Sequence, residues 1–136
     1  MISYNTDNVA MPKIRRRDTS AWIRQVAKKH GKRVGDVAYI FCNDTRILEV
    51  NRQYLQHDYY TDIITFDYTE GDVISGDIFI SLDTVSTNSE KFHTDYEQEL
   101  LRVIIHGILH LCGINDKGPG EREVMEQHEN DALALL

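Results

Sequence analysis

Residues 96–112 constrain the fold more than any other stretch of the chain, because their apolar side chains recur at the spacing of one helix face. A helix with this pattern buries its apolar face against another layer of the protein. We therefore expect the following side chains to supply core surface: Leu100, Leu101, Val103, Ile104, Ile108 and Leu111.

The rest of the pattern predicts strands interleaved with helices. Residues 63–68 and 77–81 are β-rich runs around a Glu-Gly-Asp turn and are expected to pair, while residues 37–42 read as a buried strand. This order predicts an α+β fold, a small mixed β-sheet flanked by helices, with the last helix packed over the sheet. The other expected helices run from Asp18 or Thr19 to Gly31, from Asn43 or Asp44 through Tyr54, over residues 83–92, and from Gly120 to Leu136.

Length and composition fit one globular domain spanning residues 1–136. Of the 136 residues, 41% are hydrophobic and 27% charged, with no internal repeat or flexible linker. No apolar run approaches the roughly 20 residues of a membrane span, and the first residues lack the layout of a secretory signal. We therefore expect a cytoplasmic protein with no membrane partner, in which Cys42 and Cys112 are reduced core residues.

Charge is distributed unevenly along the chain. The formal net charge of −7 argues against indiscriminate binding to nucleic acid, and no DNA partner is expected. Residues 1–35 nevertheless contain nine lysines and arginines and only two aspartates, a net charge of +7, so the remainder carries −14. This basic segment is either a solvated helix face or a patch that follows nucleic-acid phosphates, and only spatial clustering distinguishes the two.

Two histidines and one aspartate indicate a metal site. Residues four apart on a helix lie on one face about 5–6 Å apart, so His106 and His110 can share one ion. Gly113 follows the last helical turn and permits a positive φ, which lets the chain reverse and carry Asp116 back towards the rings. This ligand set leaves a fourth tetrahedral position open, as in catalytic zinc sites. His128 is the main alternative to Asp116.

The residue that follows the first histidine bears on the reaction. In the common helical zinc motif of peptidases, His-Glu-x-x-His, the glutamate is the general base. Gly107 occupies that place here, so a zinc peptidase would need a base from elsewhere. Hydrolysis of a phosphodiester fits better, because a metal ion lowers the pKa of bound water from 15.7 to about 7 and stabilises charge on a phosphoryl oxygen.

These residues resemble the motif of a known family, the YbeY-type endoribonucleases or ribosomal-RNA maturation factors. The family pattern His-Gly-x-Leu-His-Leu-x-Gly-Tyr-Asp-His corresponds to His-Gly-Ile-Leu-His-Leu-Cys-Gly-Ile-Asn-Asp at residues 106–116. Other positions before and after this motif are also similar to the family, in the family's order: Asn51, Tyr54, Asp58, residues 61–66, residues 76–80, Met125 and Glu129. Agreement at many positions in the same order is more specific than a lone pair of histidines.

The resemblance implies a zinc-dependent endoribonuclease with one Zn²⁺ ion and a preference for single-stranded RNA. It also implies a role in 3′-end maturation of 16S rRNA and in ribosome quality control. The implied partners are ribosomal RNA and the small ribosomal subunit with its proteins. The implied fold has a zincin-like metal site on a helix and the turn after it, in a groove beside a small mixed sheet.

Two positions depart from the family pattern. Asp116 stands in place of a third histidine and offers an oxygen ligand, which zinc accepts at about 2.0–2.2 Å. Leu55 stands in place of an arginine assigned to the substrate phosphate. We predict that the missing positive charge comes from one of three catalytic candidates, namely Arg102, Arg52 and His57.

Alternatives to these roles remain. Arg102 can instead pair with Glu99, three residues earlier on the same helix. Thr61, Asp62 and Thr65 either orient RNA or cap and pair a strand, and capping is favoured for the first two. The missing arginine also leaves room for a non-catalytic ribosome assembly factor, in which the metal only pins the C-terminal helices.

Overall fold

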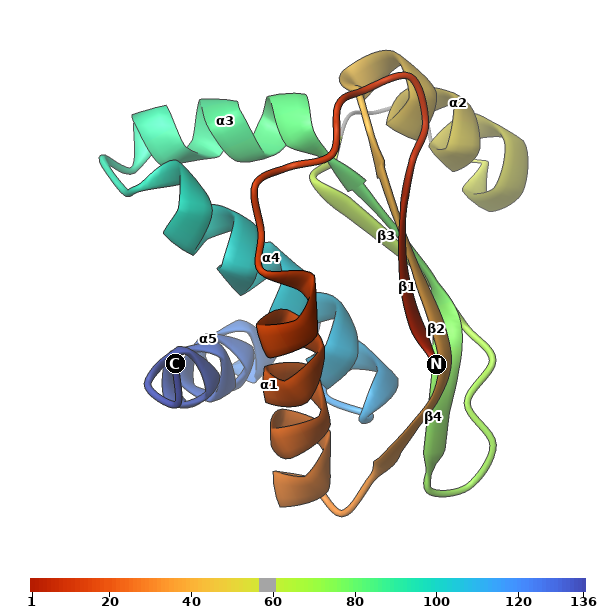
Figure 1. Cartoon of the computed structure of the whole chain (residues 1–136), viewed down its shortest axis with the longest axis vertical. Helices are drawn as coiled ribbons and strands as arrows, with labels where there is room; N and C mark the ends of the chain where they lie inside the picture. The colour runs from red at the N-terminus through yellow and green to blue at the C-terminus, as the bar shows by residue number, and fades with distance from the viewer. Residues whose placement is uncertain (57–60) are drawn as a thin grey trace.

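The computed structural model describes residues 1–56 and 61–136 and confirms the α+β class (Figure 1). Strands and helices alternate through most of the chain, and the last three elements are all helical. In chain order, the described elements are β1 (Ile2–Thr6), α1 (Arg16–Lys29), β2 (Arg33–Cys42), α2 (Asp44–Leu55), β3 (Ile63–Asp67), β4 (Val73–Ser81), α3 (Leu82–Lys91), α4 (Tyr96–Leu111) and α5 (Glu121–Leu133).

The sheet is small and mixed, as predicted. Its strands lie in the order β1-β2-β4-β3, with β1 and β4 each parallel to β2 and with β3 antiparallel to β4. The β3–β4 pair is the predicted hairpin, and its register places Ile64 opposite Phe79. Such parallel pairs require long connections, which α1 and α2 supply.

Helices cover both faces of the sheet (Figure 1). On one face α2 packs over a small cluster in which Cys42, Ile47, Val50 and Ile64 are buried. On the other face α1 and α4 enclose the main core, where the fully buried Tyr39 donates a hydrogen bond from its hydroxyl to the Ile104 carbonyl at 2.9 Å. Helices α3 and α5 pack against α4.

Gly107 sets how closely α4 approaches the sheet. A Cβ at this position would lie 2.9 Å from Cδ1 of Ile78 and 3.2 Å from Cδ1 of Ile63. Real Cβ atoms do not come so close to neighbouring atoms, so only glycine permits this approach without a shift. The close packing fixes the half of α4 that carries His106 and His110 directly against β3 and β4.

Four details differ from the expectations. Strand β1 was not predicted, and helix α1 begins at Arg16 with Arg15 as its N-cap rather than at Asp18 or Thr19. Strands β2 and β4 begin four residues earlier than expected. Helix α5 packs against α4 rather than over the sheet.

Other boundaries are confirmed. Asn43 caps α2, accepting a hydrogen bond from the Arg46 amide at 2.9 Å, and Gly31, at φ 73°, follows α1.

Cys42 is buried and Cys112 half-buried, and neither is in a disulfide. Within the described parts of the chain, every helix is too short or too polar to cross a membrane.

Candidate metal centre

Helix α4 ends in the reversal that the sequence predicts. The chain turns at Gly113, whose φ of 97° is in the left-handed region. The Gly113 amide donates to the His110 carbonyl at 3.0 Å, and the Ile114 amide donates to the Leu109 carbonyl at 3.1 Å. This pair of bonds is a Schellman motif, which satisfies the last carbonyls of the helix and directs the following loop back along α4.

The reversal brings Asp116 to both histidines. The imidazole centroids of His106 and His110 are 5.4 Å apart. Oδ2 of Asp116 lies 3.3 Å from Nε2 of His106, and Oδ1 lies 3.4 Å from Nε2 of His110. Three ligand atoms from these side chains lie within 4.8 Å of one another, so the group can hold a metal ion.

Two observations fit a metal at this point. Bonds of about 2.0–2.1 Å to one tetrahedral ion place two ligand atoms roughly 3.3–3.4 Å apart, which is the separation of each Nε2 from its carboxylate oxygen. Oδ1 of Asp116 is also buried, yet among the described residues it has no hydrogen-bond partner. A buried acceptor without a partner is costly, and a cation bound between the three side chains would remove that cost.

A second carboxylate, from α5, orients the first histidine. Glu129 is only 8% exposed, and its Oε2 lies 2.7 Å from Nδ1 of His106. Such a contact favours a proton on Nδ1 and leaves the Nε2 lone pair facing Asp116, as carboxylates behind metal-binding histidines do. Burial lowers the pKa of His106, but the hydrogen bond and charge of Glu129, aided by Asp116 and Asp62, raise it overall.

Arg102 contacts the same carboxylate, that of Glu129. Its guanidinium donates to Oε1 of Glu129 at 2.9 Å and to Oδ1 of Asn130 at 2.8 Å. The expected alternative, an ion pair with Glu99, is therefore replaced by a link across to α5. The network Arg102–Glu129–His106 ties α4 to α5 beside the candidate ligands.

Two further acids are coupled electrostatically to this site, Asp62 just before β3 and Glu99 in the first turn of α4. Asp62 precedes β3, and burial raises its pKa, an effect that the charge of His106 opposes. Burial likewise raises the pKa of Glu99, and Arg102 opposes the rise. The Thr61 hydroxyl donates to the Ile63 carbonyl, a local structural contact of the kind that the sequence favoured, whereas the bond at Asp62, from the Ser81 amide at 2.9 Å, involves only its backbone carbonyl.

The remaining candidates lie elsewhere. His128 is directed at His30, with ring centroids 5.1 Å apart, and is not in the candidate ligand group. Arg52 is in the last turn of α2, on the sheet face opposite α4. His57, like Asp58, lies outside the described residues.

The sequence analysis assigned no role in the site to Glu129, and for Asp62 it favoured capping over a part in orienting RNA. Glu129 was noted only as part of the last-helix resemblance, and no spacing rule connects it to a histidine 23 residues earlier. The one available signal for Asp62 was its place in the family-like segment 61–66.

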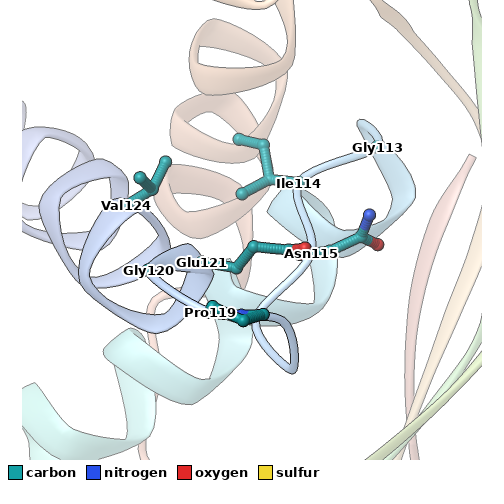
Figure 2. A pocket seen from close by; sticks show the side chains of 7 residues that line it. All are labelled: Gly113, Ile114, Asn115, Pro119, Gly120, Glu121 and Val124. Carbon is teal, nitrogen blue, oxygen red and sulfur yellow. The ribbon is translucent and has the colours of Figure 1, made fainter.

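The loop that carries Asp116 also borders a hollow of about 400 Å³ (Figure 2). Figure 2 shows that this loop and the first turn of α5 form its walls, with Ile114 and Val124 as its aliphatic side chains. The complete lining is Gly113, Ile114, Asn115, Pro119, Gly120, Glu121 and Val124. The loop that carries Asp116 is thus open to solvent on this side.

Comparisons with known proteins point to one family along nearly the whole chain. A family model described as endoribonuclease YbeY matches residues 2–136. A protein of that name from Phocaeicola vulgatus is 71% identical over 136 residues, covering 100% of this chain and 99% of the relative. One from Porphyromonas gingivalis is 50% identical over 135 residues, covering 99% and 89%. The solution structure of TM1509 from Thermotoga maritima aligns with a TM-score of 0.69 at 30% identity, covering 98% of this chain and 87% of that one.

Proposed function

Because the chain belongs to the endoribonuclease YbeY family, we propose that it is a zinc-dependent enzyme cleaving single-stranded RNA. An endoribonuclease is a hydrolase that acts on RNA, and the full-length match supports this class for the chain. We further propose that one domain, residues 1–136, acts in the cytoplasm on ribosomal RNA. Its specific roles would be 16S rRNA 3′-end maturation and ribosome quality control, with the small ribosomal subunit and its proteins as partners.

The convergence of His106, His110 and Asp116 is the observation that supports metal dependence. Two imidazoles and one carboxylate form a ligand set that suits Zn²⁺. Mg²⁺ and Ca²⁺ suit it less well, because they prefer sites made of oxygen ligands alone. Bound zinc would supply a Lewis acid for a phosphoryl oxygen and lower the pKa of a water molecule.

The chain's own residues would hold and orient the reactants. Glu129 accepts from Nδ1 of His106 and so keeps Nε2 directed at the ion. Arg102 steadies Glu129 from the other side and places a positive charge one helical turn from His106. We propose that this charge stabilises the anionic transition state, with Arg52 and His57 as the other candidates.

One observation favours a second candidate function. The guanidinium of Arg102 is already engaged by Glu129 and Asn130, and Leu55 stands in place of the family arginine. A non-catalytic assembly factor with a structural metal would need no free cation at the site. Gly107, packed against Ile78, leaves no carboxylate at the position of a peptidase base, which weighs against a zinc peptidase.

Cleavage of a single-stranded rRNA fragment separates the first two functions. We expect the zinc-loaded chain to cut the fragment, and chelation or His110→Ala to abolish cutting and stoichiometric zinc together. His128→Ala is the matched control and should retain both, because His128 faces His30. Cutting by a metal-free chain that is still folded in a melting experiment would refute metal dependence, and no cutting by the zinc-loaded chain would favour the assembly factor.

A further inference from the structure

Helix α1 presents a row of cations on the side opposite its buried face. The buried side chains of α1 are Thr19, Trp22, Ile23, Val26 and Ala27. At 100° per residue, Arg17, Arg24 and Lys28 fall within a narrow stripe diametrically opposite that set, and all three are exposed. We call these three residues the α1 basic face. Along the helix axis, Arg17 and Arg24 are about 10 Å apart, and Arg24 and Lys28 are about 6 Å apart.

The α1 basic face is not neutralised by the protein. Within the described parts of the chain, Arg17, Arg24 and Lys28 take part in no ion pair, and the one acid of α1, Asp18, pairs with Arg15 at 3.9 Å. Arg24 and Lys28 are like charges four residues apart, an arrangement that destabilises an isolated helix. The concentration of cations on one face of an otherwise acidic chain therefore indicates an anionic partner.

Helix α1 is held in a fixed position relative to the metal centre. The Trp22 indole donates to the Ala132 carbonyl of α5 at 2.8 Å, and His30 contacts His128 of the same helix. Helix α5 also carries Glu129, which contacts His106. An anionic chain bound on α1 would thus lie at a constant distance from the candidate metal site.

We propose that the α1 basic face binds phosphates of single-stranded RNA outside the metal centre and so raises the affinity for long substrates. The inference rests on the proposed function, which makes RNA the polyanion that the chain must hold. A row of exposed point charges suits the backbone of a flexible strand. A membrane surface fits less well, because Ala21 is the one apolar side chain between these cations and the helix buries its apolar face in the core.

Salt-dependent RNA binding tests the proposal. Labelled single-stranded RNA of about 20 nucleotides is titrated with chains that carry His110→Ala, so that the RNA stays intact. Adding Arg17→Gln, Arg24→Gln and Lys28→Gln should reduce the slope of log Kd against log salt by about 2, because each lost phosphate contact removes about 0.7. If affinities converge near 1 M salt, this corresponds to roughly 100-fold weaker binding at 0.1 M.

A matched variant removes the same net charge elsewhere. Arg33→Gln, Lys91→Gln and Arg122→Gln neutralise exposed cations on β2, α3 and α5 and should change the slope much less. Replacing Arg17 and Arg24 by lysine should keep most of the original slope. Equal slopes in both glutamine variants, or an unchanged slope in the α1 variant, would overturn the proposal, the latter leaving an acidic protein as the partner of this face.

Cleavage separates this inference from the proposed function. With His110 intact, the α1 glutamine variant should cut a trinucleotide at the wild-type rate and show a raised KM only for long RNA. Failure of the wild-type chain to cut either substrate would contradict the proposed function, while the binding slopes would still decide the role of α1.

Discussion

Glu129 is the residue on which the geometry of the site depends most. Its two carboxylate oxygens contact different partners, Nδ1 of His106 at 2.7 Å and the Arg102 guanidinium at 2.9 Å. Because Glu129 is buried, salt should screen these contacts less than it screens ion pairs on the open surface. A single side chain on α5 therefore fixes both the tautomer of a candidate ligand and the place of the nearest cation.

Glu129→Gln tests this role while preserving the shape of the side chain. We expect zinc affinity to fall about 10- to 100-fold, because loss of the carboxylate weakens the basicity and orientation of His106. Glu126→Gln, an exposed change on the same helix, is the control. Competition with a chromophoric chelator measures both affinities, and equal values for the two variants would show that Glu129 does not act through His106.

At the scale of elements, the contact between α4 and the sheet determines where the candidate ligands lie. Gly107→Ala would put a methyl group 2.9 Å from Ile78, which is fully buried. Overpacking of about 1–3 kcal/mol outweighs the roughly 0.5–1 kcal/mol that alanine adds to helix stability. We expect a net loss of about 1 kcal/mol in the free energy of unfolding by urea.

The companion change Ile78→Val removes the clashing Cδ1 and checks this explanation. In the double variant Gly107→Ala with Ile78→Val, the two changes should cost less together than the sum of their separate effects. Simple additivity would mean that the helix does not press on Ile78.

The contact between α1 and α5 should make stability depend on pH. Burial lowers the pKa of His30, and the charges of His128 and Lys29 lower it further; Asp131 lines the same hollow. A histidine whose folded pKa is below 6.5 takes up protons more readily when unfolded, so stability decreases as the pH falls from 6.5 through the folded pKa.

His30→Gln should remove this acid sensitivity. Between pH 7.5 and pH 5, the variant is expected to lose less free energy of unfolding than the wild-type chain. His93→Gln, at an exposed histidine outside the pair, should follow the wild type. Parallel curves for the wild type and His30→Gln would contradict the assignment.

Elements whose signals are local were predictable, and those that depend on distant partners were not. The β3–β4 hairpin and the apolar face of α4 follow from short-range patterns. Strand β1 has few apolar residues and forms only by pairing with β2, placing Ile2 beside Val37. Asp18 resembled a cap, but it lies in the first turn of α1, where a negative charge favours the helix N-terminus.

The same reasoning separates the two halves of the site. His106, His110 and Asp116 could be singled out as candidate ligands because a helical repeat and a turn connect them within eleven residues. Glu129 reaches them only through the packing of α5 on α4, which no local pattern encodes.

At the scale of the whole molecule, the candidate metal centre lies where α4, the following loop and α5 meet. A cation bound there would join three segments and stabilise the folded chain by mass action. At a free zinc concentration 100 times Kd, we expect about 2.7 kcal/mol of added stability. Thermal melting should show a raised Tm for the wild type and none for Asp116→Ala, and equal shifts in both would place the zinc elsewhere.

X-ray absorption at the zinc edge tests the central claim most directly, because it reports the atoms bound to the metal. Cys112 lies two residues after His110 and is the nearest competing ligand in the sequence. The site described here predicts two imidazoles and light-atom neighbours at about 2.0–2.2 Å. A sulfur neighbour at about 2.3 Å, or a single imidazole, would contradict the ligand set His106, His110 and Asp116.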